Sequence, residues 1–160
     1  MAESREPEQP ATPQPESDEE REGAYALLQR GLALIRSRHH AQAAIVLERA
    51  ARAEPGKGSI LEPLGRAYHH SGQFERARET FEALLEVDPS AHWAHFALAT
   101  SLRKLDRISE ARTHLRLAVA LSPGSALYRQ ALERLGPEQP GTAKPGPEQP
   151  GPAKPGDAAD

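Results

Sequence analysis

Seven histidines are the side chains of this sequence best suited to metal binding or acid–base chemistry. The sets that lie closest along the chain are His39 with His40, His69 with His70, and His92 with His95. Adjacent residues on a helix point about 100° apart, so an adjacent pair chelates one ion poorly. His92 and His95 could share a helix face, but no third ligand completes the set. We therefore expect structural or surface histidines and no metal site.

The groups that enzymes use most often for covalent catalysis are absent from the sequence. It has no cysteine, which excludes thiol nucleophiles, thiolate metal sites and disulfides together. A nucleophile elbow, a Gly-rich phosphate loop and a helix-borne His-Glu-x-x-His motif are missing as well. We expect no enzyme activity and no cofactor.

Proline and charge divide the chain into three parts. Most of the fifteen prolines cluster at the two ends, whereas nearly all large apolar residues lie within residues 23–135. The net charge is −6 for residues 1–22, +5 for residues 23–135 and −2 for residues 136–160. A charge of +5 is too weak for a nucleic-acid footprint. We expect one folded domain, residues 23–135, between two disordered tails.

The C-terminal tail is itself repetitive. Residues 136–155 are two copies of a ten-residue unit, GPEQPGTAKP and GPEQPGPAKP, and the tetrad PEQP also occurs at residues 7–10. Half of the unit is proline or glycine, so we expect polyproline II conformations rather than a packed structure. The tail could be a solubilising spacer or a ligand of a proline-binding domain, and both interpretations stay open.

The N-terminus shows no export signal, since it lacks both a basic start and an apolar run. A run of about 18 apolar residues, which a membrane-spanning helix needs, occurs nowhere. We therefore expect a cytoplasmic protein that does not enter the membrane.

A period of 34 residues organises the middle of the chain. Pro55, Pro89 and Pro123 are spaced 34 apart. The columns that come into register with them are Ala43, Ala77 and Ala111; Leu47, Phe81 and Leu115; and Gly31, Gly65 and Ala99. A fixed period of this length is typical of stacked repeat proteins. It predicts three units, residues 24–57, 58–91 and 92–125.

Each unit has the pattern of two helices. The small residues Gly65 and Ala77 would let the two helices pack closely, and Gly72 lies between them as a stop and turn. The proline at the end of each unit stops the second helix. The expected helices are residues 24–37, 41–53, 60–71, 74–87, 92–105 and 108–121.

Two further features complete the expected helices. Pro63 fits the first turn of its helix, with Ser59 or Glu62 as the cap, because its missing N–H would have no partner there. Residues 125–135 form a capping helix that shields the last apolar face. The residues expected to face inward on it are Leu127, Ala131, Leu132 and Leu135, and those expected to face outward are Arg129, Glu133 and Arg134.

The middle unit, residues 58–91, resembles the tetratricopeptide repeat (TPR) family. The residues that fall at the spacings of that family are Leu64, Gly65, Tyr68, Gly72, Phe74, Ala77, Phe81 and Pro89. The other two units depart more from the pattern, with Arg30 and His40 in the first and Ala99 and Leu102 in the third. The resemblance implies an all-α, right-handed superhelix of three hairpins whose first helices line a concave groove for a protein ligand.

The resemblance also implies which residues line that groove. They are Tyr25, Leu28, Leu32 and Ile35 in unit one, Glu62, Arg66 and His69 in unit two, and Trp93, Phe96, Thr100 and Arg103 in unit three. Trp93 is the leading anchor, because Trp, Tyr and Arg dominate interface energetics. The implied partner is an apolar or aromatic segment with acidic flanks that meet Arg66 and Arg103. Alternatively, Trp93 and Phe96 pack on the second helix of unit two.

Some members of the family hold the carboxylate ends of heat-shock chaperones with a clamp of Lys, Asn and Arg. The corresponding columns here are Leu28, Leu32, Pro63, Trp93 and Ala97. The clamp is absent, so a chaperone C-terminal carboxylate is not the expected ligand, and neither nucleic acid nor membrane is an expected partner.

Three other roles remain open. The apolar stripe of unit one, formed by Leu28, Leu32 and Ile35, could join two copies of the chain or lie buried under the N-terminal tail. The acidic run between Glu16 and Glu22 could fold back onto the basic body and compete with the ligand. RNA binding by the helical repeat is the least favoured, because the acidic tails would repel phosphate.

Overall fold

The computed structural model describes the backbone of residues 18–137 and the side chains of residues 23–137. Seven helices and no strand occur in this part of the chain, which confirms the all-α fold. They are α1 (Asp18–Arg36), α2 (His40–Ala53), α3 (Gly58–His70), α4 (Phe74–Val87), α5 (His92–Lys104), α6 (Ile108–Leu121) and α7 (Ala126–Glu133). None of these helices is both long and apolar enough to cross a membrane. Of the proposed tails, residues 1–22 and 136–160, the parts 1–17 and 138–160 lie outside the described residues.

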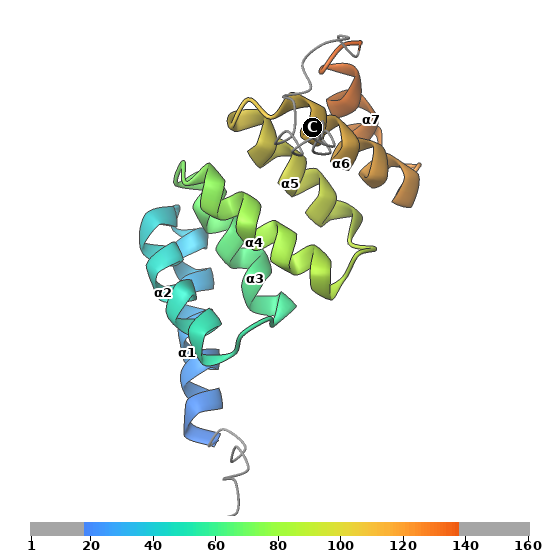
Figure 1. Ribbon diagram of the computed structural model, residues 1–160. Helices are drawn as coiled ribbons and strands as arrows, with labels where there is room; N and C mark the ends of the chain where they lie inside the picture. The colour runs from blue at the N-terminus through green and yellow to red at the C-terminus, as the bar shows by residue number, and fades with distance from the viewer. Residues whose placement is uncertain (1–17, 138–160) are drawn as a thin grey trace, which may run out of the picture.

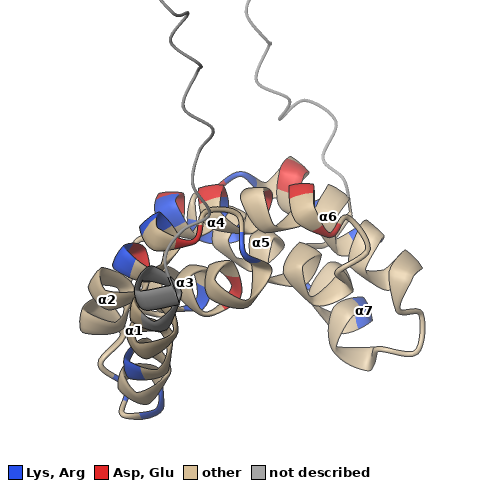
Figure 2. Ribbon diagram, turned by 90° about the horizontal axis from the view of Figure 1, so that it is seen from below, with Lys and Arg blue, Asp and Glu red and all other residues tan. Residues whose placement is uncertain are grey.

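The helices pack as three hairpins, α1 with α2, α3 with α4, and α5 with α6 (Figure 1). Each hairpin packs on the next through contacts of α2 with α3 and of α4 with α5. The first helices of the hairpins also touch one another, α1 with α3 and α3 with α5. Figure 2 shows the array as an arch with α4 and α6 along its outer side and α3 beneath them. The helices α1, α3 and α5 therefore form the inner face of the arch.

The end of each hairpin is fixed by the proline column. The residues that cap α2, α4 and α6 are Glu54, Asp88 and Ser122, with φ of −129°, −135° and −138°. Each is followed by a proline, which moves the preceding residue out of the helical region and removes the next backbone donor. The predicted helix stops are confirmed.

The turn within each hairpin follows the same period. Arg38, Gly72 and Asp106 are spaced 34 apart and all have positive φ, of 62°, 81° and 60°. Only glycine takes this conformation without steric cost. The predicted turn at Gly72 is confirmed, and the first and third hairpins make the same turn with a non-glycine residue.

Small residues allow the two helices of a hairpin to approach closely. A Cβ on Gly65 would lie 2.6 Å from the ring of Phe81, and a Cβ on Gly31 would lie 2.5 Å from Leu47. Phe81 and Leu47 are almost completely buried, as is Ala77. The predicted stripe of Leu64, Tyr68 and Phe81 forms part of the core.

Pro63 does not lie in the first turn of its helix, contrary to the sequence-based expectation. The helix α3 begins at Gly58 with Lys57 as the N-cap, so neither Ser59 nor Glu62 caps it. Starting the helix earlier buries Ile60 in the core. Pro63 is consequently inside the helix and buried, and it leaves the carbonyl of the exposed Ser59 to water.

The first and last helices also differ from the expectation. The backbone of α1 is helical from Asp18, so residues 18–22, which the sequence analysis placed in the tail, extend the first helix. On α7 and the turn after it, Ala131, Leu132 and Leu135 pack inward as predicted, whereas Leu127 is 54% exposed and Tyr128 is buried in its place. Tyr128 takes the buried position because its hydroxyl and ring meet α5, and Ser125 caps the helix by accepting a hydrogen bond from the Tyr128 N–H.

A buried arginine on the third hairpin holds the end of the described chain. The Arg112 guanidinium donates to the backbone carbonyls of Leu135, Gly136 and Pro137, at 3.3, 2.7 and 3.4 Å. Carbonyls at the end of a helix lack partners within the helix and carry partial negative charge, so a cation stabilises them. Arg112 therefore fixes the chain after α7 against α6.

Candidate functional site

The predicted groove residues belong to α1, α3 and α5, the first helices of the three hairpins. On α3 and α5 the residues between the predicted positions are mostly buried, whereas the exposed residues between them on α1 are Ala26, Gln29, Arg30 and Ala33. The exposed members are Tyr25, Arg66 and Arg103, and the half-buried members are Leu28, Leu32, Ile35, Glu62, His69, Trp93, Phe96 and Thr100. None of them lines the pocket between α2, α3 and α4 or the pocket between α4, α5 and α6.

Trp93 and Phe96 are half-buried at the C-terminal end of this surface. The Phe96 ring lies 5.1 Å from the ring of Tyr128, so it packs on the last helix, α7. Both residues also pack against the hydrophobic core. Part of each side chain stays accessible, and Trp93 is not wholly interior.

Polar contacts between α3 and α5 stiffen the middle of the surface. His69 Nδ1 lies 3.0 Å from Ser101 Oγ, which joins the two helices. Burial lowers the pKa of His69, and the nearby His70 lowers it further, so its neutral form is favoured. Arg66 forms an exposed ion pair with Glu62 at 3.8 Å. The cationic head of Arg66 is therefore weakly held and accessible.

The unit-one stripe is partly in use within the molecule. Leu28 and Ile35 pack against the core. Tyr25, in contrast, is 63% exposed. Tyr25 is the aromatic residue of this stripe, and most of its surface is accessible.

One inner-face residue was missed by sequence reasoning. Leu127 on α7 lies 34 positions after Trp93 and 102 positions after Tyr25, so all three occupy the same column of the repeat. The sequence analysis assigned Leu127 to the core of a capping helix, but its exposure extends the apolar surface beyond Trp93. The 34-residue period itself would have identified it.

The acidic run proposed to fold back onto the body is largely helical. Asp18, Glu19, Glu20 and Glu22 belong to the backbone of α1, which restricts where they can reach. Acidic residues in the first turn of a helix also favour the helix electrostatically.

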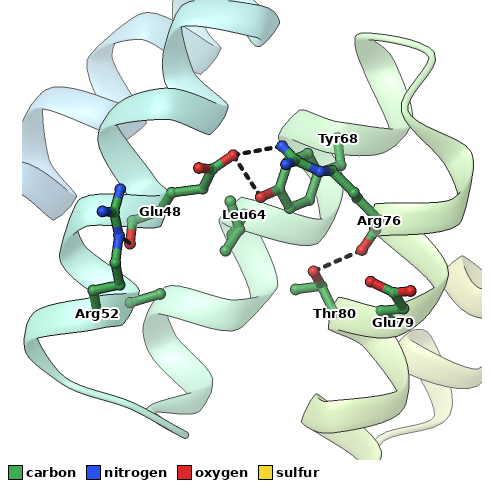
Figure 3. A pocket seen from close by; sticks show the side chains of 8 residues that line it. Glu48, Arg52, Leu64, Tyr68, Arg76, Glu79 and Thr80 are labelled. Atoms are coloured by element: carbon green, nitrogen blue, oxygen red, sulfur yellow. Dashed lines mark hydrogen bonds and ion pairs between the residues drawn. The ribbon is translucent and has the colours of Figure 1, made fainter.

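The outer side of the arch carries a pocket of about 320 Å³ between α2, α3 and α4. Figure 3 shows the Glu48 carboxylate directed toward both Tyr68 and Arg76. The Tyr68 hydroxyl donates to Glu48 at 2.7 Å, and Arg76 pairs with the same oxygen at 2.9 Å. Burial and the bond to Glu48 raise the pKa of Tyr68. The polar groups here satisfy one another.

A second outer pocket of about 410 Å³ lies between α4, α5 and α6. Its lining residues are Glu82, Leu85, Glu86, Pro89, His95, Leu98 and His114. His95 Nδ1 lies 3.0 Å from His114 Nδ1, and His95 Nε2 lies 3.1 Å from the carbonyl oxygen of Pro89. Burial and the neighbouring His95 lower the pKa of His114. This groove was not anticipated, because its partners are 19 residues apart.

Several histidines make contacts that the sequence could not specify. His92, which was considered together with His95, instead lies 2.8 Å from the hydroxyl of Tyr128. His40 and His70, from two different predicted pairs, have ring centroids 4.8 Å apart. Within residues 18–137 no group of three or more His, Cys, Asp or Glu residues is placed to hold a metal ion.

A family model described as tetratricopeptide repeat matches residues 28–75 and 63–126. The chain belongs to the tetratricopeptide repeat family. Superkiller complex protein 3 of Mus musculus is 32% identical over 112 residues, and that of Homo sapiens is 30% identical over 112 residues. Each match covers 70% of this chain but only 7% of the relative, so the TPR chain spans a small part of these relatives.

Solved structures of TPR domains share the fold. The first TPR of Spaghetti (RPAP3), bound to the HSP90 peptide SRMEEVD, matches with a TM-score of 0.67 and 16% identity, over 71% of this chain and 90% of that one. The Arabidopsis OM64 TPR domain matches with a TM-score of 0.68 and 19% identity, over 72% and 96%. The Sgt2 TPR domain from Aspergillus fumigatus matches with a TM-score of 0.64 and 22% identity, over 70% and 76%. At these identities the likeness concerns the fold alone.

Proposed function

We propose that this TPR domain is a non-catalytic adaptor that binds a short segment of a partner protein on its inner face. The segment is apolar or aromatic and carries acidic flanks. Its apolar part lies on Trp93, Phe96 and Leu127, and its acidic flanks meet Arg66 and Arg103. The setting is the cytoplasm, as expected from the sequence.

The observation that carries the proposal is the accessible aromatic and cationic surface around Trp93. Trp93 and Phe96 are half-buried, so each is held in place by the core while presenting part of its ring. Rigid aromatic side chains lose little conformational freedom on binding and are common anchors. Arg103 is exposed on the same helix, about two turns beyond Phe96.

The comparisons support a protein ligand without defining it. The RPAP3 domain was solved with an HSP90 peptide, which concerns that protein, and the curated relatives are named as proteins of a complex. In this chain the columns of the chaperone clamp hold Leu28, Leu32, Pro63, Trp93 and Ala97. None of these can pair with a terminal carboxylate, so we propose an internal apolar segment instead of a chaperone C-terminus.

Affinity purification with the full chain tests this site. We expect Trp93→Ala and Arg103→Glu each to weaken capture of the main partner at least tenfold. Arg49→Glu, an exposed change on α2 outside the inner face, is the matched control and should leave capture unchanged. Equal capture by all four proteins, with circular dichroism showing that each is folded, would rule out the inner face as the binding site.

A further inference from the structure

The two outer pockets occupy the same place in successive repeats but differ in charge. Adding 34 to Glu48, Ala51, Leu64 and Thr80 of the first pocket gives Glu82, Leu85, Leu98 and His114 of the second. In the first pocket Arg52 and Arg76 balance the acidic residues Glu48 and Glu79. The charged residues that line the second pocket are Glu82 and Glu86, and no Lys or Arg is among the described residues that line it. We call the second pocket the α4–α6 groove.

Glu86 is the acidic residue of this groove whose charge has no ion-pair partner among the described side chains. It stands where the first pocket has Arg52. Glu82 is already paired with Arg78 at 2.5 Å. Glu86 is exposed and makes no ion pair with any residue whose side chain the structure describes. A cation brought to this rim would therefore meet an available carboxylate.

The polar groups at the base of the α4–α6 groove also favour a ligand that donates a hydrogen bond. The Pro89 carbonyl can only accept, so His95 Nε2 carries the proton and donates to it. When His95 carries its single proton at Nε2 it accepts at Nδ1, and His114 Nδ1 is then the donor in their 3.0 Å contact. This assignment leaves His114 Nε2 as an acceptor. Leu85, Pro89 and Leu98 supply the apolar remainder of the lining.

We propose that the α4–α6 groove binds a basic segment of a partner protein. The aliphatic stem of one lysine or arginine lies on Leu85, Pro89 and Leu98, and its cationic head meets the Glu86 carboxylate and His114 Nε2. Long cationic side chains bury their stems on apolar surface and keep the charge at a polar rim. The groove lies on the outer side of the arch, whereas the proposed ligand of the inner face has acidic flanks. The domain would thus hold two segments of opposite charge on opposite sides.

Fluorescence anisotropy with a labelled twelve-residue peptide of alternating lysine and leucine tests the groove in the full chain. We expect Glu86→Arg, which restores the charge of the first pocket, to weaken binding at least tenfold, and Glu86→Gln to weaken it several-fold. Arg52→Glu, the reciprocal change in the first pocket, is the matched control and should not weaken binding. A peptide with glutamate in place of lysine should not bind. Equal binding by wild type and Glu86→Arg, or equal binding of the two peptides, would overturn the proposal.

Two further experiments test whether something other than an external partner occupies the groove. The chain has its own lysines at Lys144 and Lys154, in the segment beyond residue 137. If changing both to alanine strengthens peptide binding, that segment occupies the groove and the external partner is ruled out. If Glu86→Arg converts a dimer into a monomer in light scattering, a second copy is the occupant and the proposal fails. Unchanged peptide binding in the first arm and a monomer in the second support an external basic segment.

Discussion

The two outer pockets show that one repeat geometry can produce a pocket whose polar groups pair with one another and a pocket that keeps a carboxylate unpaired among the described side chains. In the first pocket, Tyr68 and Arg76 both contact the carboxylate of Glu48. In the α4–α6 groove the same columns hold Leu102 and Glu110, and Glu110 turns away to pair with Arg107 at 2.7 Å. The first pocket therefore ties α2, α3 and α4 together, whereas the second leaves Glu86 free to meet a ligand.

The comparison shows that the 34-residue period fixes where a side chain lies but not what that side chain does. Backbone packing recurs every 34 residues, so equivalent side chains reach equivalent places. A substitution at one column then changes the chemistry of one pocket without disturbing the stack.

The largest expected effect is on the free energy of unfolding, and it comes from the packing of α4, the helix that both outer pockets share. Helix α4 lines both pockets, and Phe81 seats it over Gly65. We expect Phe81→Ala to lower the free energy of unfolding by about 3–5 kcal/mol, because it leaves a cavity in the core. Urea unfolding measures this. Val87→Ala, an exposed change on the same helix, should cost less than about 0.5 kcal/mol.

The close approach of α3 and α4 gives the next largest effect. Gly65→Ala places a methyl group 2.6 Å from Phe81, so we expect a loss of about 1–3 kcal/mol. The third unit has Ala99 and Leu115 in these columns. The double variant Gly65→Ala with Phe81→Leu copies that pair and should recover part of the loss relative to the two single changes. Simple additivity of the two losses would show that the pair is not the cause.

The closed network of the first pocket should contribute less than the core. We expect Tyr68→Phe to lower the free energy of unfolding by about 1 kcal/mol, because the bond to the Glu48 carboxylate is lost. The same loss should be absent in a background that already carries Glu48→Ala, because that variant has no side-chain oxygen to accept the bond. For contrast, Glu82→Gln in the α4–α6 groove removes a pair with Arg78 near the surface and should cost less than about 1 kcal/mol.

The smallest expected effect is a pH dependence that arises from the α4–α6 groove. The pKa of His114 is lowered by burial and by His95, while Glu82 and Glu110 oppose the shift. The unfolded chain therefore binds this proton more readily, and the stability contributed is complete above about pH 6.5 and is lost as the pH falls below it. His114→Gln should flatten the fall in melting temperature between pH 7.5 and pH 5.5.

His69 and His70 also have lowered pKa values, so the variant should retain part of the fall. An identical pH profile for wild type and His114→Gln would show that His114 does not titrate differently on folding. The range stays above the titration of most carboxylates, which keeps the lowered pKa of Glu110 out of the comparison.

Local pattern was sufficient to predict most of the fold. The proline column, the turn at Gly72 and the small residue at Gly65 act on their own helix or on the next one, within one hairpin. Pro63 was placed wrongly because the start of α3 depends on burying Ile60, which propensity does not encode. Leu127 was placed wrongly because Tyr128, one position later, takes the contact with α5.

The candidate site was less predictable than the fold. The resemblance to a repeat family implied which columns face inward, but it did not imply that Phe96 packs on Tyr128 or that His69 is bonded to Ser101. It also gave no indication of the α4–α6 groove, whose acidic residues Glu82 and Glu86 lie outside the columns that carried the resemblance. The first of these contacts joins a hairpin to the last helix, and the second joins two hairpins.

The sequence by itself determined the number of helices, their pairing and their turns, because these follow from residue types that recur every 34 positions. Tertiary structure alone decided which polar groups meet: Glu48 with Tyr68, and His95 with His114. The physical reason is that a helix shows a whole stripe of residues to its neighbours. Only the packing angle and the register of the stacked helices select which side chains come within hydrogen-bond distance.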